Sequence, residues 1–360
     1  MDPSEFTARR NRLHEVMSEG KLDGFLVTAL VNVRYLSGFT GSNGVLLLGG
    51  REPLLFTDPR YEIQSARQTN CRVRIVRGPL VRAVGASLRR RRWKRIGFEN
   101  GRIGLEVYRG LERTLAPGAA LVEADDAIER LRMIKSAAEI ALIRTSVAAC
   151  SKAYASALRR LKPGLREQDL AARLEFEMRR LGAEKPAFET IVAAGERAAL
   201  PHAEPSARSI GSNELLLIDM GAQLQGYASD MTRMAHLGAP ARKTRQLYDA
   251  VLEAQLAAIE KVRPGITTDA VDGEARRVLG HYGLGERFTH STGHGLGLEI
   301  HEAPRIGHGD RTRLAAGMVI TVEPGVYMEG FGGIRIEDTV LVTSSGHEVL
   351  TPTPKELKVV

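Results

Sequence analysis

The chain has 360 residues, of which 43% are hydrophobic and 26% charged, a composition typical of a globular protein large enough for two domains. Two cysteines, Cys71 and Cys150, are too few for a disulfide framework, and no apolar stretch approaches the ~20 residues of a membrane span. The polar start of the chain lacks the apolar core of a signal peptide, so we expect a cytoplasmic protein with buried or inert thiols.

The net charge of +8 is concentrated in the first part of the chain. Residues 1–130 contain 22 Lys and Arg against 15 Asp and Glu, and much of the excess lies in the Arg-rich run 89–95. Such a run could bind nucleic acid, but a solvated helix end is the commoner structure, and no recognised nucleic-acid motif accompanies it. We therefore expect neither a nucleic-acid nor a membrane partner.

Apolar runs alternate with helical patterns along the first third of the chain. We expect a helix over residues 5–19 that ends at Gly20, and further helices over residues 61–68 and 80–92. The expected strands are five apolar runs, at residues 25–30, 45–49, 53–57, 73–76 and 95–99. This alternation predicts a mixed α/β domain.

The pattern changes near residue 125 to a single long helix, expected over residues 128–161. We place the domain boundary there, with residues 1–127 in the first domain and residues 128–360 in the second. Beyond the boundary, two helices followed by a strand-rich block occur twice, which predicts an antiparallel sheet backed by two helix pairs. The segment LKPG at 161–164 recurs as VRPG 101 positions later, in support of an internal repeat.

Acidic residues recur at matching positions of the two halves. Asp219 ends the apolar run of LLLIDMG, and Glu323 ends that of VITVEPG, 104 positions later. Asp230 follows the first by 11 residues, and Glu337 follows the second by 14. The duplication predicts two half-domains that each donate two carboxylates to a site on a pseudo-twofold axis. Four carboxylates brought together repel one another unless cations lie among them, so we predict a metal site.

Histidines accompany these carboxylates. His290 and His294 lie four residues apart in THSTGHGLG, His301 lies in EIHEAP, and His202 lies in LPHAEP. A single histidine is more often structural than a ligand. Ordered pairs on a duplicated frame are much less often accidental, so we treat these histidines as site residues.

The expected ligand set contains four carboxylates and one imidazole: Asp219, Asp230, His294, Glu323 and Glu337. This oxygen-rich set favours Mn²⁺, with Co²⁺, Fe²⁺ or Zn²⁺ also able to bind, and argues against a structural zinc held by thiolates. Four carboxylates suit two ions, and ions ~3.5–4 Å apart can share a water and lower its pKa. The remaining histidines can donate hydrogen bonds to an oxyanion or carry a proton.

Three segments around these residues resemble the pita-bread metallopeptidase family, which contains methionine aminopeptidase, prolidase, aminopeptidase P and the metal-free creatinase. The segments are IDMGAQLQGYASDMTR, HSTGHGLGLEIHEAPRI and TVEPGVYMEGFGGIRIEDTVLV. The resemblance covers nearly the whole chain and implies a two-domain α/β (α+β) protein with a creatinase-like first domain and a pita-bread second domain. It also implies that Asp219 chelates one ion, that Asp230 and Glu337 bridge both, and that His294 and Glu323 bind the other.

The same resemblance assigns accessory roles around the metals. It makes His202, His290 and His301 the accessory histidines and Arg335 a supporting arginine. We expect His202 to hydrogen-bond the scissile carbonyl or the oxyanion, and His301 to orient the substrate backbone. Glu323 is expected to pass a proton from the nucleophile to the leaving nitrogen as well as to bind metal.

The specificity expected for the chain comes from its N-terminal part. Segments 32–44 (NVRYLSGFTGSNG) and 56–61 (FTDPRY) resemble the first domain of aminopeptidase P. We therefore expect a homodimeric Xaa-Pro aminopeptidase that cleaves between an N-terminal residue and a following proline, with Tyr327 at the proline pocket. An Xaa-Pro dipeptidase (prolidase) stays open; it would need a positioned arginine for the substrate carboxylate, and Arg34 and Arg60 lie beside these segments. A non-catalytic pita-bread binding module is the alternative of another class, against which the complete ligand set argues.

Overall fold

The computed structural model describes residues 2–50 and 52–360 of the chain. They form two compact units, Met1–Arg132 and Met133–Val360, each with its own hydrophobic core. The division falls near the end of helix α6 (Ala127–Met133), whereas the sequence pattern placed the boundary at its start. No helix in the described part of the chain has the length and apolar character needed to cross a bilayer.

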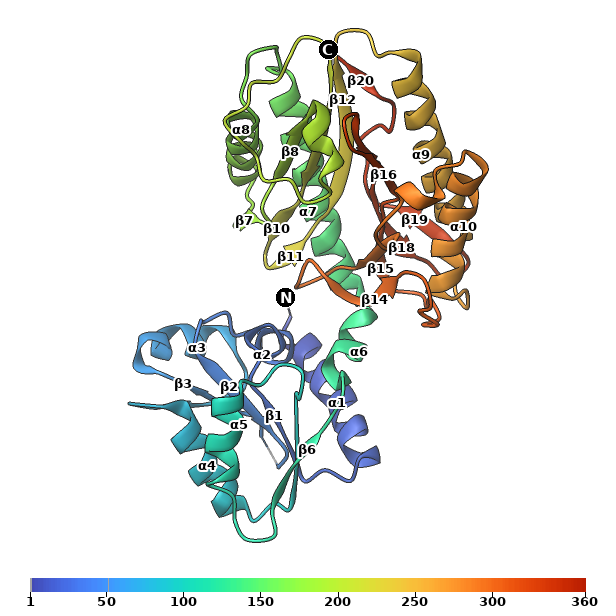
Figure 1. Cartoon of the computed structure of the whole chain (residues 1–360). Coiled ribbons are helices and arrows are strands. Elements are labelled where there is room, and N and C mark those ends of the chain that lie inside the picture. Colours follow the sequence, from blue (N-terminus) through green and yellow to red (C-terminus); the bar gives the residue numbers. More distant parts are fainter. Residues whose placement is uncertain (1, 51) are drawn as a thin grey trace. The chain divides into compact units, whose positions relative to one another are not determined.

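The N-terminal unit is built on a six-stranded mixed sheet with helices packed against it (Figure 1). The strand order is β4-β3-β2-β1-β5-β6; β2 pairs antiparallel with β1 and β3, and the other pairs are parallel. The strands are β1 (Gly24–Val27), β2 (Gly44–Leu48), β3 (Leu54–Thr57), β4 (Arg72–Ile75), β5 (Arg95–Phe98) and β6 (Ala120–Glu123). The helices before α6 are α1 (Pro3–Glu19), α2 (Leu30–Ser37), the 3₁₀ turn η1 (Pro59–Tyr61), α3 (Glu62–Gln68), α4 (Leu80–Arg91) and α5 (Leu105–Glu112).

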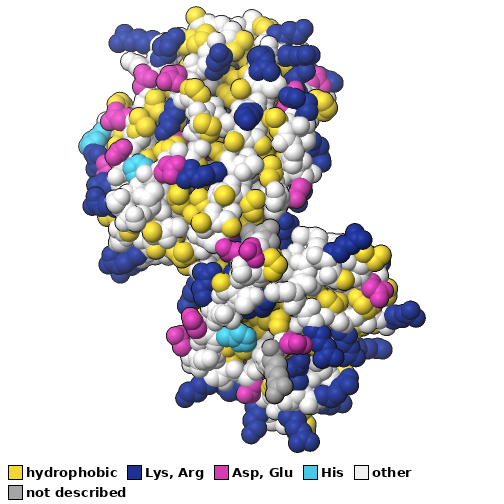
Figure 2. All heavy atoms as spheres, turned by 180° about the vertical axis from the view of Figure 1, so that it is seen from behind, with side chains coloured by type: hydrophobic (Ala, Val, Ile, Leu, Met, Phe, Trp, Pro, Cys, Tyr) yellow, Lys and Arg dark blue, Asp and Glu magenta, His cyan; other side chains and the backbone are white. Residues whose placement is uncertain are grey.

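The predicted strands and helices of this unit are present, with one run divided between two elements. The apolar run at 25–30 contains strand β1, which ends at Val27, and the start of helix α2 at Leu30. A short apolar run does not by itself distinguish a buried strand from a buried helix. The Arg-rich run 89–95 forms the last turn of α4 and the first residue of β5, as expected for a solvated helix end. Figure 2 shows Lys and Arg side chains over much of the visible face of this unit, the lower of the two.

The single long helix predicted over residues 128–161 is wrong. The structure contains two helices there, α6 and α7 (Ala137–Leu158). A capping box separates them: the Ser136 hydroxyl accepts from the Glu139 amide at 3.3 Å, and the Glu139 carboxylate accepts from the Ser136 amide at 2.9 Å. These paired bonds satisfy amides that an uninterrupted helix would have bonded internally, so a new helix begins at residue 137.

The second unit repeats a helix pair and a strand block, as the duplicated sequence predicts. Helices α7 and α8 (Glu167–Arg180) belong to the first half, and α9 (Arg242–Lys261) and α10 (Thr268–His281) to the second. In Figure 1, α8 and α9 lie on opposite outer sides of the unit with strands between them. The connections contain two 3₁₀ turns, η2 (Gly195–Ala199) and η3 (Gly285–Arg287).

The strands of this unit form two main sheets. The sequence predicted a single antiparallel sheet, and this prediction is wrong in the number of sheets. The first sheet has the order β20-β12-β9-β8 and the second β14-β13-β15-β18-β19. Strands β12 and β18 meet at the junction, but no ladder is formed between them: β12 pairs with β9 and β20, and β18 with β15 and β19. The junction is made by single bonds instead, such as Glu337 N to Thr232 O at 3.2 Å.

The first sheet contains β8 (Ile191–Ala194), β9 (Glu214–Met220), β12 (Met231–Leu237) and β20 (Lys358–Val359). The second contains β13 (Gly293–Gly295), β14 (Glu302–Ile306), β15 (Val319–Val322), β18 (Asp338–Val342) and β19 (His347–Val349). Small sheets are formed by β7 (Lys185–Pro186), β10 (Ala222–Leu224) and β11 (Tyr227–Ala228), and by β16 (Gly325–Met328) and β17 (Gly332–Arg335).

Strand β9 shows how this core aims a site residue. Leu216 and Ile218 pack in the cluster formed with α7 and α8, whereas Leu215 and Leu217 pack in the cluster that contains the strands of the second half. Side chains alternate between the two faces of a strand. Asp219 therefore lies on the face of Leu217 and points toward the second half.

Both cysteines are buried free thiols, as expected from the sequence. Burial raises the pKa of Cys71, and it raises the pKa of Cys150 to about 12. Both groups are therefore neutral thiols with little reactivity at neutral pH.

Candidate metal centre

The five predicted ligands lie at strand ends that meet between the two halves. Asp219 is the penultimate residue of β9, and Asp230 immediately precedes β12. Glu323 immediately follows β15, and Glu337 immediately precedes β18. His294 is the central residue of β13. Because β9 and β12 are antiparallel, as are β15 and β18, each strand pair brings its two carboxylates to one end.

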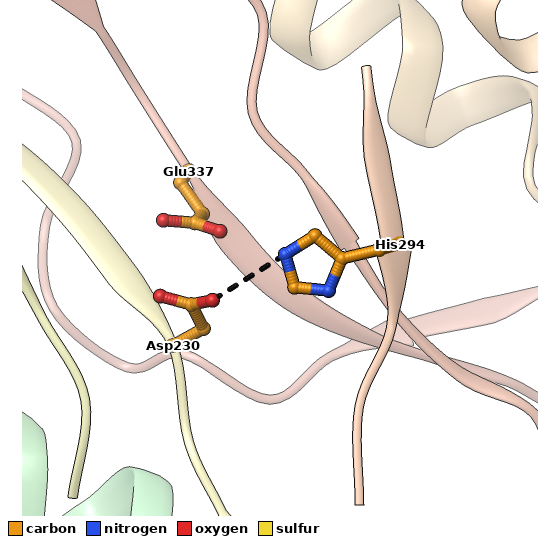
Figure 3. A group of neighbouring side chains, drawn as sticks. All are labelled: Asp230, His294 and Glu337. Carbon is orange, nitrogen blue, oxygen red and sulfur yellow. Dashed lines mark ion pairs between the residues drawn. The ribbon is translucent and has the colours of Figure 1, made fainter. Parts of the chain in front are cut away.

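Three of these residues form a compact cluster, shown in Figure 3. One ligand atom from each of Asp230, His294 and Glu337 lies within 4.8 Å of the others. His294 Nε2 is 3.6 Å from Asp230 Oδ2 and 3.4 Å from Glu323 Oε1. Asp219 is held by Arg335, whose Nη2 donates to its Oδ2 at 2.5 Å.

The carboxylates are buried with too little positive charge to balance them. Asp230 and Glu337 are 5% and 1% exposed, and burial, followed by repulsion from neighbouring carboxylates, raises the pKa of both well above the usual range. Burial also raises the pKa of Glu323 to about 7, despite the opposing effect of Arg335. These are the conditions in which bound cations stabilise the ionised groups.

Two carboxylate oxygens point to where such cations would bind. Asp219 Oδ1 and Glu337 Oε1 are buried and have no hydrogen-bond partner among the described residues. A buried acceptor without a partner costs free energy, and a divalent cation would satisfy both oxygens. The residues present therefore fit a centre for divalent ions.

The imidazole of His294 also fits this role. Its Nδ1 lies 3.0 Å from the carbonyl oxygen of Gly295, which can only accept, so Nδ1 carries the proton and Nε2 is free toward the carboxylates. Burial, followed by the nearby His301, lowers the pKa of His294 to about 4. The ring is thus neutral at physiological pH, the form that binds metal.

His290 lines the cleft that contains the predicted ligands and belongs to a network of hydrogen bonds. Its Nδ1 faces the Ser291 carbonyl at 2.8 Å and therefore donates, and its Nε2 lies 2.8 Å from the Tyr327 hydroxyl. Arg335 Nη1 donates to the same hydroxyl at 2.7 Å, and its Nη2 binds Asp219. Both ring nitrogens of His290 are thus used inside the protein. Tyr327, which the sequence placed at the proline pocket, belongs to this hydrogen-bond network and is 8% exposed.

A cleft of about 530 Å³ opens over the ligands. His202 and His301 are exposed and line it, and the rings of His301 and His294 make an edge contact with centroids 4.4 Å apart. The apolar lining includes Phe188 and Ile300. His202 and His301 are therefore free to contact a substrate, whereas His290 also lines the cleft but has partners inside the protein at both ring nitrogens.

Arg305 is a cleft residue that the sequence interpretation missed. Its side chain lines the cleft, and its Nε donates to the Ser291 hydroxyl at 2.7 Å. In the part of the chain that the structure describes, it makes no ion pair with a carboxylate. The spacing of His301 and Arg305 was a signal, because Arg305 follows His301 by four positions and alternate residues of a strand share a face. In the structure, His301, Ala303 and Arg305 are all exposed, on β14 and the residue before it.

The loop that carries His202 is anchored by a buried carboxylate on α8. Glu167 is fully buried and accepts from the Ser206 amide at 3.0 Å and the Ser206 hydroxyl at 2.6 Å. It also pairs with Arg197 at 3.0 Å, and Arg197 donates to the Glu204 carbonyl at 2.5 Å. These contacts fix the backbone on the C-terminal side of His202.

In the second half, a buried carboxylate on α10 anchors the segment that precedes His294 in a similar way. Asp272 is fully buried and accepts from the Thr292 amide at 3.1 Å and hydroxyl at 2.8 Å. It pairs with Arg276 at 2.7 Å, and Arg276 donates to the His290 carbonyl at 2.6 Å. The segment that leads into His294 is therefore fixed by a helix of its own half.

Family models match both units. Residues 141–344, which include all five predicted ligands, match metallopeptidase family M24. The chain belongs to this family. Residues 9–134 match the Creatinase/Prolidase N-terminal domain. The predicted pita-bread resemblance and the mixed α/β fold class are thereby confirmed for this M24 chain.

Relatives of this M24 chain match it over nearly its whole length. It is 39% identical over 350 residues to the Xaa-Pro dipeptidase of Pyrococcus furiosus, covering 97% of this chain and 99% of that protein. Its structure is similar to that of the Xaa-Pro dipeptidase from Bacillus anthracis, with a TM-score of 0.95, 36% identity and coverage of 99% and 100%. It is also similar to X-Pro aminopeptidase from Thermotoga maritima, with a TM-score of 0.89, 36% identity and coverage of 94% and 98%.

Proposed function

We propose that this chain is a metal-dependent Xaa-Pro dipeptidase. The observation that carries the proposal is Arg305, a cationic side chain without an ion-pair partner among the described residues, in the cleft over the ligands. A dipeptide presents a free carboxylate immediately beyond proline, and a planar guanidinium can bind it through two parallel hydrogen bonds. The names of the Pyrococcus and Bacillus relatives support the same specificity.

The Xaa-Pro aminopeptidase expected from the sequence is the second candidate. The Thermotoga relative, an X-Pro aminopeptidase at 36% identity, supports it. An aminopeptidase leaves the side beyond proline open to longer chains, so it has no need of a cation for a carboxylate at that point. We retain a homodimer as an expectation from the family resemblance and a cytoplasmic location as an expectation from the sequence.

In the proposed reaction, two divalent ions, when bound, supply an activated water and polarise the scissile carbonyl. The donor set favours Mn²⁺, with Co²⁺, Fe²⁺ or Zn²⁺ as alternatives. The residues that would hold them are Asp219, Asp230, His294, Glu323 and Glu337.

The chain's own residues would act around that centre. His202, exposed in the cleft, would donate a hydrogen bond to the carbonyl oxygen as negative charge develops on it. His301 would orient the substrate backbone, and Glu323 would deliver the proton to the proline nitrogen. Arg335 and His290 would act indirectly, since their contacts hold Asp219 and Tyr327 in place.

The test compares Leu-Pro with Leu-Pro-Gly on the Mn²⁺-loaded protein. We expect a higher kcat/KM for the dipeptide. Arg305→Gln should lower kcat/KM for Leu-Pro by roughly 10- to 100-fold, mainly through KM, because a hydrogen-bonded charge is lost. The same change should have little effect on Leu-Pro-Gly.

Arg311→Gln is the matched control, because Arg311 is an exposed arginine that does not line the cleft. Strong cleavage of the tripeptide with negligible cleavage of the dipeptide would make the protein an aminopeptidase. Failure to cleave either peptide, with metal bound, would reject both candidates.

A further inference from the structure

Two carboxylates in the cleft have no role in the proposed metal centre. Glu189 and Glu204 both line the cleft and are both exposed. Neither side chain makes an ion pair within residues 2–50 and 52–360. Their negative charges are therefore available to a bound molecule.

Glu189 lies in the cleft that also contains the predicted metal ligands. Ile191 lies opposite Asp219 in the pairing of β8 with β9. Glu189 precedes Ile191 by two residues, and its side chain lines the same cleft as Asp219.

Glu204 is presented by a fixed loop. Its carbonyl accepts from Arg197 at 2.5 Å, and Arg197 is paired with the buried Glu167. Two residues earlier on this loop, His202 is exposed in the same cleft. The backbone of Glu204 is thus held while its carboxylate is left uncommitted.

We propose that Glu189 and Glu204 form a subsite for a cationic side chain on the N-terminal residue of the substrate, so that Arg-Pro and Lys-Pro are preferred dipeptides. This inference rests on the proposed function. The substrate's α-ammonium is only one carbon from the scissile carbonyl and so lies close to the ligand carboxylates. Glu189 and Glu204 are two further, exposed carboxylates in the same cleft and are suited to the charged end of a long side chain.

The apolar lining supports the same substrate class. Phe188 and Ile300 line the cleft together with the two glutamates. Lys and Arg place their methylene stems along apolar surface while the charged group reaches polar partners. An aspartate or glutamate at this position of the substrate would be repelled by both carboxylates.

The experiment measures kcat/KM of the Mn²⁺-loaded enzyme for Arg-Pro and citrulline-Pro, which match in shape and differ in charge. We expect the wild-type enzyme to prefer Arg-Pro by roughly fivefold at low salt, a preference that falls as salt is added. Glu189→Gln and Glu204→Gln should each reduce this ratio, and the double variant should bring it to about one. Glu-Pro should be the poorest substrate of the wild type and improve in the double variant.

Glu196→Gln is the control, because Glu196 is an exposed glutamate of η2 outside the cleft, and it should leave the ratio unchanged. Equal wild-type rates for Arg-Pro and citrulline-Pro would overturn the subsite. An equal loss of kcat/KM for both substrates in the Gln variants would also overturn it, since the carboxylates would then bind the α-ammonium.

If no Xaa-Pro peptide is cleaved, the proposed function fails by itself. The subsite is then judged by saturation-transfer NMR of free arginine against free citrulline, where equal binding rejects it.

Discussion

The burial of Glu337 favours cation binding but lowers the stability of the metal-free protein when this carboxylate is ionised. Its pKa in the metal-free protein is raised, first by burial and then by Asp230. A carboxylate whose pKa is higher in the folded than in the unfolded chain contributes full stability below the unfolded pKa, and that contribution is lost as the pH rises toward the folded pKa. The metal-free protein should therefore lose stability as the pH rises above about 4.3, the unperturbed pKa of a glutamate.

Replacing this carboxylate by an amide separates binding from folding. Glu337→Gln should stabilise the metal-free protein at pH 8 by about 1–3 kcal/mol, have a smaller effect at pH 5, and abolish the stabilisation produced by Mn²⁺. Urea unfolding with chelator and with Mn²⁺ measures both effects. Glu260→Gln, on the exposed surface of α9, is the charge-matched control. A metal-free Glu337→Gln protein less stable than the wild type at pH 8 would contradict this account.

His202 should affect the reaction without affecting metal content. It is exposed in the cleft and lies outside the cluster of ligand atoms. His202→Ala should lower kcat by ~10²–10³, the usual effect of removing one donor to an oxyanion. Elemental analysis should find the metal unchanged, and His308→Ala, an exposed residue outside the cleft, should match the wild type in both measurements. Selective loss of metal would identify His202 as a ligand.

Helices α8 and α10 hold different parts of the site, and conservative changes should separate their roles. Glu167 anchors the loop that carries His202, whereas Asp272 anchors the segment that leads into His294. Glu167→Gln should therefore lower kcat with the metal content unchanged. Asp272→Asn should weaken metal binding, because a ligand is no longer held in place.

Both changes remove the charge of a buried carboxylate that is paired with a partly exposed arginine and should destabilise the protein, so each assay must be run well below the unfolding temperature. Metal titration and kcat, measured on the same preparations, provide the test. Equal metal affinity in the two variants would show that the two anchors are not specific to their loops.

The two units of the molecule have separate cores, and the five predicted ligands all belong to the second. Trp93, the only tryptophan of the chain, belongs to the first. Metal stabilises the unit that binds it. Mn²⁺ should therefore raise the unfolding midpoint measured by far-UV circular dichroism while leaving the midpoint measured by Trp93 fluorescence unchanged. Equal shifts of both signals would mean that the units unfold together.

The sequence by itself determined the features that depend on local pattern. Apolar periodicity located most strands and helices of the first unit, because the spacing of buried side chains follows from strand and helix geometry. The repeat at an offset of slightly more than 100 residues identified Asp219, Asp230, Glu323 and Glu337 together, since matching positions of a duplicated chain occupy matching places in the fold.

The tertiary structure decided what depends on contacts between distant residues. The chain order does not show that β12 and β18 meet without forming a ladder, so that the strands of the second unit form two main sheets. Nor does it show that both nitrogens of His290 are bound inside the protein, or that Arg305 reaches the cleft without a partner among the described residues. Hydrogen-bond partners and burial are set by the packing of segments far apart in sequence, whereas periodicity reports only which face of an element is apolar.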